Sequence, residues 1–212
     1  MNQKCIWYIS KYLVIPRESS LGARGFLIME ELSKLGHKCV VITSDSIAFS
    51  KVPALKENLS IKEISGVEVI CLRTYKYKIA KSFKRLISWL HFEWKLLFFS
   101  KGKIKSPDTI IVSSLSLLTI FNGLIFKYRY KCRLVFEVRD IWPLTLIEEG
   151  GFKKSNVFIR LLSLVEKIGY KYSDHIVGTM PNLKEHVEHI VGSEKPVSCI
   201  PMGIDINSIE NS

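Results

Sequence analysis

The amino-acid sequence predicts an α/β fold with a doubly wound, mainly parallel sheet and helices on both faces. Short apolar runs alternate along the chain with longer segments whose apolar residues recur at helical spacing. This order is typical of βαβ units. Several runs, such as Lys38–Thr43, are almost continuous in apolar residues, as expected of strands that are buried on both faces. The 212 residues suffice for one large domain with a substantial core or for two small ones.

The elements alternate from the start of the chain. Cys5–Ser10 is the first predicted strand, and Gly25–Leu35 is the first helix, which Gly36 ends. The further predicted strands are Lys38–Thr43, Gly66–Leu72, Thr109–Val112, Leu134–Val138, Asp174–Gly178 and Val197–Ile200, and the further helices are Ile79–Phe99, Leu117–Tyr128, Ser155–Tyr172 and Asn182–Val191. Open α/β sheets bind ligands at the carboxyl ends of their strands, so the residues just after each strand are the candidates for function.

Two features bear on the cellular compartment. The uncharged run Ile110–Phe126 contains serine, threonine, asparagine and glycine, and it is shorter than the roughly 20 residues of a membrane-spanning helix. It is therefore predicted as a buried strand, a turn and a buried helix, and the amino terminus is not predicted to be a signal peptide. The five cysteines are odd in number and have no metal-site spacing, which favours a reduced, cytoplasmic protein without a metal site.

The charge balance predicts an anionic partner. Lysine and arginine number 31 against 20 acids, a formal net charge of +11. Such a balance suits nucleic acid, anionic lipid or a phosphorylated substrate. The choice among them depends on where the charge lies.

Much of the charge lies in Lys76–Lys105, which has nine basic residues and one acid, Glu93. Apolar residues at helical spacing form one predicted face, and basic residues with Ser88 and His91 fill most other positions. An aromatic apolar face with a basic face is typical of a helix on anionic lipid. The residues predicted to bind a membrane are Lys81, Lys84, Arg85, Trp89 and Trp94. The alternative is an ordinary helix docked on the sheet with a solvated basic side. A nucleic-acid site is not favoured, because the aromatic residues share the apolar face.

The loop after the first strand is a predicted ligand loop. Lys11–Arg24 is longer than the usual βα connection of roughly 2–6 residues. Gly22 would let the backbone approach a bound group, and Arg24 could pair with a phosphate or carboxylate, or else be merely solvated. The dinucleotide fingerprint and the P-loop are absent, which counts against an NAD enzyme or an NTPase.

The segment Leu134–Leu146 carries the strongest chemical signal. An apolar strand runs into Glu137, Arg139 and Asp140, and Trp142-Pro143 then enforces a loop. Buried charge requires a partner. Asp140 therefore either pairs with Arg139 or presents a carboxylate to a substrate hydroxyl. The acidic loop that follows, 148–151, either borders the same cleft or is a simple solvated turn.

Three segments together resemble glycosyltransferase family 4, the GT-B enzymes that build bacterial surface polysaccharides. They are "YISKYLVIPRESSLGARGFLIMEELSKLGHKCVVITS", "VFEVRDIWP", and "SDHIVGTMPNLKEHV" with "IPMGID". The second segment is similar to the subgroup that transfers deoxy-amino sugars of the N-acetylfucosamine type in O-antigen and capsule synthesis. The third resembles the hinge after the family's N-terminal domain, with Met202 in place of the usual asparagine.

The resemblance implies a Rossmann-like acceptor domain over residues 1–200 and the start of a hinge over 201–212. A donor-binding domain is expected on the far side of that hinge, and the chain alone is expected to be inactive, as a fragment, a truncated product or one half of a split enzyme. The implied reaction retains the anomeric configuration and uses no metal or cofactor. Asp140 is the implied catalytic residue, and Gly22, Arg24, Arg139 and Trp142 are the implied contacts to acceptor or phosphate.

The implied partners are a sugar nucleotide, a lipid-linked acceptor of the undecaprenyl diphosphate type and the anionic inner face of the cell membrane. A separate C-terminal half is a further expected partner, and nucleic acid is not one. The sequence leaves two alternatives open, half of a GT-B sugar-nucleotide 2-epimerase and a non-enzymatic peripheral membrane remnant.

Overall fold

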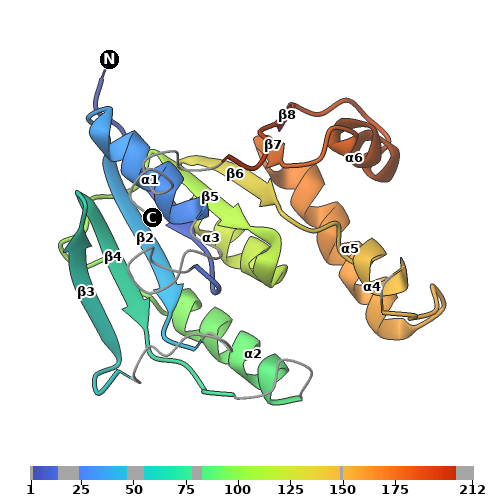
Figure 1. Ribbon diagram of the computed structural model, residues 1–212, viewed down its shortest axis with the longest axis horizontal. Helices are drawn as coiled ribbons and strands as arrows, with labels where there is room; N and C mark the ends of the chain where they lie inside the picture. Colours follow the sequence, from blue (N-terminus) through green and yellow to red (C-terminus); the bar gives the residue numbers. More distant parts are fainter. Residues whose placement is uncertain (1, 14–23, 47–54, 78–82, 149, 204–212) are drawn as a thin grey trace, which may run out of the picture.

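The protein is described by a computed structural model over residues 2–13, 24–46, 55–77, 83–148 and 150–203. One eight-stranded sheet has the order β3-β4-β2-β1-β5-β6-β7-β8 (Figure 1). All neighbouring strands are parallel except β3 and β4. The predicted doubly wound, mainly parallel fold is therefore confirmed. The strands are β1 (Cys5–Ile9), β2 (Lys38–Ser44), β3 (Leu59–Ile64), β4 (Val67–Leu72), β5 (Thr109–Ser113), β6 (Arg133–Val138), β7 (His175–Gly178) and β8 (Val197–Cys199).

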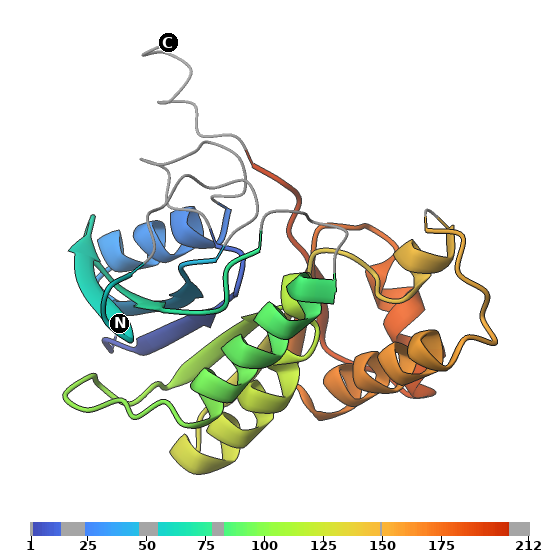
Figure 2. The same cartoon turned by 90° about the horizontal axis from the view of Figure 1, so that it is seen from below.

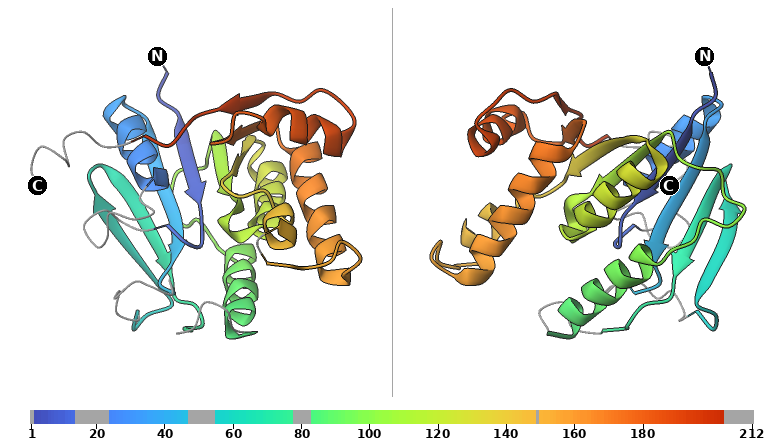
Figure 3. Two further views of the ribbon diagram at one scale, coloured as in Figure 1. Left: turned by 45° about the vertical axis from the view of Figure 1, so that its right-hand side comes forward. Right: turned by 180° about the vertical axis from the view of Figure 1, so that it is seen from behind.

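Helices cover both faces of the sheet, as predicted. On one face, α1 (Arg24–Lys34) packs against β2 and β4. On the other face, α3 (Thr119–Tyr130) packs against β5 and β6, with α2 (Phe83–Leu97) and α5 (Val157–Tyr172) on either side of it (Figure 2). The view from behind shows α2 and α3 in front of the sheet, on the side opposite α1 (Figure 3). The last helix, α6 (Leu183–Val191), lies against α5 and β8.

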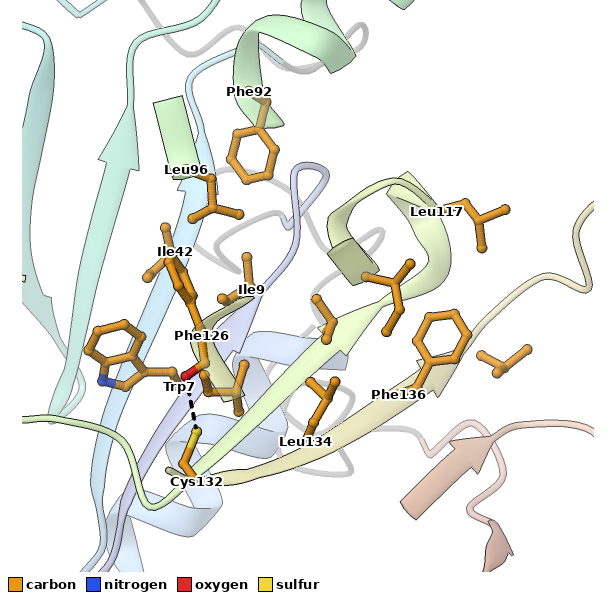
Figure 4. Packing of buried hydrophobic residues seen from close by; sticks show 14 of the residues in the cluster. Trp7, Ile9, Ile42, Phe92, Leu96, Leu117, Phe126, Cys132, Leu134 and Phe136 are labelled. Atoms are coloured by element: carbon orange, nitrogen blue, oxygen red, sulfur yellow. Dashed lines mark hydrogen bonds between the residues drawn. The ribbon is translucent and has the colours of Figure 1, made fainter. Parts of the chain in front are cut away.

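The larger core lies between the sheet and α2, α3 and α5. Trp7 of β1 is fully buried in it and makes edge-on contacts with Phe99, Phe126 and Tyr130. Figure 4 shows part of this core, including Trp7 and Phe126 and the contact of the Cys132 thiol with the Phe126 carbonyl at 3.9 Å. The smaller core beneath α1 receives Tyr8, since successive residues of a strand point to opposite faces.

The structure adds one strand that the sequence did not predict. β3 pairs antiparallel with β4 at the edge of the sheet, and the turn between them places Ser65 and Gly66 at φ 50° and 76°. The predicted strand Gly66–Leu72 consequently begins at Val67. Most of β3 is exposed, so it lacks the apolar signal of the buried strands.

Two further segments can be compared with the sequence prediction. The run Ile110–Phe126 forms β5, a short 3-10 turn η1 (Ser114–Ser116) and part of α3, which confirms the predicted strand, turn and helix. A short helix, α4 (Leu144–Glu148), follows the Trp142-Pro143 loop and was not predicted. None of the helices in the described residues is long and apolar enough to cross a membrane.

Candidate functional site at the carboxyl edge of the sheet

The candidate site lies where the strand order reverses. From β1 the chain passes to β2 on one side, and it later returns to β5 on the other side of β1. The carboxyl ends of β1, β5 and β6 are therefore neighbours, because these strands are parallel. The segments that follow them are Ser10–Leu13, η1 and Arg139–Trp142, and such a switch point is where open α/β sheets bind ligands.

Ser114 of η1 holds the loop that contains Asp140. Its Oγ accepts hydrogen bonds from the backbone N–H groups of Arg139, at 2.9 Å, and Asp140, at 3.4 Å. Within the described residues, no salt bridge joins Arg139 to Asp140. The carboxylate of the half-buried Asp140 therefore does not form the ion pair with Arg139 that was one of the two alternatives from the sequence.

Trp142 lies beside this loop and contacts α2. Its ring meets that of Trp89 edge-on, with the centroids 6.4 Å apart. The indole Nε1 of Trp142 is buried and has no hydrogen-bond partner among the described residues. A buried indole N–H without an acceptor is unusual, so this atom is a candidate donor to a ligand.

Arg24 connects three segments at this edge. Its Nε lies 3.3 Å from Oε1 of the buried Glu137 of β6. Its two terminal nitrogens donate to the carbonyls of Pro201 and Ile200, at 2.8 and 2.9 Å. Phosphate binding by Arg24 stays a prediction, and it would require the guanidinium to share or give up these contacts.

Glu137 has a second partner in Tyr8. The Tyr8 hydroxyl donates to Oε2 of Glu137, and burial together with the carboxylate raises the pKa of Tyr8 well above its usual range. α1 approaches Tyr8 so closely that a Cβ on Gly25 would lie 2.4 Å from the ring. Glycine at this position therefore allows Arg24 to reach Glu137.

A cluster of cations and aromatic rings follows β1. Lys11 is fully buried, donates to the Ser46 carbonyl at 3.0 Å, and lies 4.7 Å from the centre of the Tyr12 ring. Burial, and next the charge of Arg85, lowers the pKa of Lys11 to about 7. The Tyr12 hydroxyl accepts from Trp89 Nε1 and, at 3.4 Å, from Arg85 Nε. Arg85 and Trp89 of α2 thus face this cluster.

The match to known proteins agrees with this architecture. A family model described as Glycosyltransferase Family 4 matches residues 26–208. The chain belongs to glycosyltransferase family 4. No curated protein matches the sequence significantly.

Solved structures resemble this family 4 domain in fold. Sucrose-phosphate synthase from Thermosynechococcus elongatus superposes with a TM-score of 0.64 at 13% identity, over 97% of this chain and 49% of that one. The catalytic domain of starch synthase IV from Arabidopsis thaliana, bound to ADP and acarbose, gives 0.66 at 12% identity, over 98% and 53%. The chain therefore spans about half the length of these structures, and at such identities the likeness concerns the fold alone.

The orientation of α2 in this family 4 domain differs from the predicted one. Ser88, Phe92 and Leu96 form its buried side, although Ser88 was assigned to the polar face. The exposed apolar residues are Ile87, Leu90, Trp94 and Phe98. The reason is that α2 contacts Ser46 through the small Ser88 side chain, and the two Oγ atoms lie 3.4 Å apart.

The predicted membrane residues consequently separate into two groups. Lys84 and Trp94 are exposed, whereas Arg85 and Trp89 face the cluster at Tyr12. Lys81, like Gly22 of the first loop, lies outside the described residues.

Glu93 is the one acid of the basic stretch, and it joins α2 to α3. Its carboxylate accepts hydrogen bonds from Ser116, Thr119 and Asn122, at 3.1, 2.6 and 2.7 Å. Burial raises the pKa of Glu93 to about 7 despite these donors. Glu93 had no predicted role, although a lone acid among nine cations indicates a partner inside the protein.

Proposed function

We propose that the protein is a retaining glycosyltransferase that transfers a sugar from a sugar nucleotide to a lipid-linked diphosphate acceptor in bacterial surface polysaccharide synthesis, such as O-antigen or capsule. This domain would form the acceptor side of the cleft. Family membership supports sugar transfer. The observation that carries the proposal is the carboxylate of Asp140, half-buried at the switch point of the sheet and not paired with Arg139.

In this proposal, Asp140 orients the acceptor hydroxyl or accepts its proton, as a positioned general base does. Ser114 would keep the carboxylate in place through the backbone of the loop. Trp142 and Trp89 offer ring surfaces against which a sugar packs, and Trp142 Nε1, which has no hydrogen-bond partner among the described residues, is a donor beside them. Arg24, Arg139 and Gly22 remain the proposed contacts to the acceptor or its phosphates, and the sugar nucleotide is a substrate rather than a cofactor.

The exposed stripe on α2 supports a lipid-linked acceptor. Ile87, Leu90, Trp94 and Phe98 recur along one side of the helix and face outward. Such a stripe, with lysine beside it, is typical of a helix that lies in a membrane interface. We propose that the protein binds peripherally to the inner face of the cell membrane through this stripe. The opposite side of α2 then keeps Trp89 at the candidate site.

The test is sugar transfer in membranes from cells that produce this domain together with its expected donor-binding half, because the domain alone is expected to be inactive. A panel of radiolabelled sugar nucleotides is supplied, and label in lipid-extractable material is counted for the native protein and for Asp140→Asn. Glu63→Gln, which removes an exposed carboxylate from the edge strand β3, is the matched control. We expect label with the native protein and the control but not with Asp140→Asn. Epimerisation of the sugar nucleotide at C2 without any lipid product would instead support the epimerase alternative.

A further inference from the structure

A second charged surface lies at the opposite edge of the sheet, where β1, β5 and β6 begin. The turn after α2, the end of α3 and the start of β6 meet there, and the ends of α2 and α3 lie side by side in Figure 2. These segments contribute six cations, which define the amino-edge basic face: Lys101, Lys103, Lys105, Arg129, Lys131 and Arg133.

The basic face has two hollows, and Tyr130 lines both of them. One hollow, of about 620 Å³, is lined by Phe98, Lys101 and Arg129 among others. The second, of about 710 Å³, is lined by Lys131 and Arg133 among others. Both hollows thus combine cations with space for a small anionic group.

The acids near these hollows are already engaged within the protein. Asp108 accepts the backbone N–H of Cys5 at 2.7 Å. Asp174 accepts from Lys127 at 2.6 Å and from the backbone N–H of Leu134 at 2.8 Å. By contrast, the exposed side chains of Lys103, Arg129 and Lys131 form no hydrogen bond or ion pair within the described residues. The face therefore presents an excess of positive charge over Asp108 and Asp174, the acids that line the second hollow.

Exposed aromatic residues border the basic face. Trp94 of α2 and Phe98, the residue after its end, are 63% and 66% exposed, and their ring centroids are 4.7 Å apart. Tyr128 of α3 is 71% exposed. Aromatic rings next to lysine and arginine are typical of surfaces that sit at the level of lipid headgroups. The same stripe continues through Leu90 to Ile87, aliphatic residues that a bilayer would bury and a nucleic acid would not.

We propose that the amino-edge basic face docks on an anionic phospholipid bilayer, with its cations at headgroup phosphates and Trp94 and Phe98 in the interface. The inference rests on the proposed function and deepens it, because it identifies the face that meets the membrane. It differs from the sequence prediction, which put the basic contact at the other end of the stretch, on Lys81, Lys84 and Arg85. α2 then lies along the membrane, with the candidate site near its first turns and the basic face at its end.

The test compares two triple variants that each lower the formal net charge by three, from +11 to +8. The patch variant carries Lys103→Gln, Arg129→Gln and Lys131→Gln. The matched control carries Lys56→Gln, Lys62→Gln and Lys184→Gln, three exposed cations away from the basic face. Binding is measured by co-sedimentation with phosphatidylcholine vesicles, with and without phosphatidylglycerol. Each cation near an anionic surface accounts for about fivefold in affinity, so the patch variant should bind about 100-fold more weakly than the native protein.

Several outcomes separate the possibilities. Native binding should require phosphatidylglycerol and be released by high salt, and the control should bind within a few-fold of native. Equal losses of vesicle affinity in both variants would show that net charge alone accounts for binding, and they would overturn the proposal. Loss of affinity for a duplex oligonucleotide with vesicle binding intact would make the face a nucleic-acid site, and it would overturn the proposal as well. Transfer to a water-soluble, short-chain acceptor does not need the bilayer, so its absence when the domain is supplied with its expected donor-binding half would refute the proposed function and not the docking face.

Discussion

Glu93 offers a quantitative test of how α2 is held on the domain. Burial raises the pKa of its carboxyl from 4.5 to about 7 in the folded protein. A carboxyl whose pKa is raised by folding binds its proton more tightly in the folded state. It therefore favours folding below pH 4.5, and this contribution is lost as the pH rises towards 7. A shift of about 2.5 units corresponds to about 3 kcal/mol in total.

Glu93→Gln removes the titration while keeping the shape of the side chain. The amide oxygen can still accept from Ser116 and Thr119, as Oε1 of the carboxylate does. The amide nitrogen of the new glutamine would face Nδ2 of Asn122, which is also a donor. The Oδ1 of Asn122 is buried and has no partner among the described residues, and a flip of the Asn122 amide would turn this acceptor towards the glutamine nitrogen. That flip gives up the 3.0 Å hydrogen bond from Nδ2 to the Glu93 carbonyl.

The measurement is the free energy of unfolding by urea at pH 5 and pH 8.5. The stability of the variant relative to the native protein should rise by about 2 to 3 kcal/mol between these values, or roughly 5–10 °C in Tm for a chain of this length. Glu185→Gln, at an exposed position on α6, should leave the pH dependence unchanged. A native protein and a Glu93→Gln variant with parallel pH profiles would refute the assignment of a buried, proton-binding carboxyl between α2 and α3.

Three further predictions follow from the carboxyl edge. In the enzyme completed with its expected donor-binding half, Asp140→Asn should lower turnover by about 10²–10⁴ with little change in Tm, and normal turnover with a lowered Tm would show that Asp140 is structural. Gly25→Ala should lower the free energy of unfolding by about 1–3 kcal/mol, because its Cβ would lie 2.4 Å from the Tyr8 ring; an unchanged urea midpoint would contradict this close packing. Lys11→Met should stabilise the protein most below pH 7, because burial lowers the pKa of Lys11 to about 7 and folding then penalises the charged form. That advantage should shrink as the pH rises from 7 towards 10.5, and a difference independent of pH would argue against a buried, titrating lysine.

The sequence by itself determined the fold class and the edge where function is sought. The interior strands β1, β2, β5 and β6 are buried on both faces, so their apolar runs are unambiguous. The parallel order then follows from the helices between them, and it brings the residues after β1 and β6 to one edge. The edge strand β3 escaped prediction because its exposed faces carry polar residues and its pairing depends on the turn at Ser65 and Gly66.

Only the tertiary structure decided which side chains are committed to internal partners. Arg24 and Glu137 are 113 positions apart in the chain, so no local pattern predicts their contact. The same holds for the orientation of α2, where periodicity placed Ser88 on the polar face although packing buries it. Helical spacing indicates that a helix has two faces, but the choice of the buried one depends on the shape of the surface it meets. For α2 that surface is built by Ser46 and by the segments that follow β1 and β5, which the chain brings together only on folding.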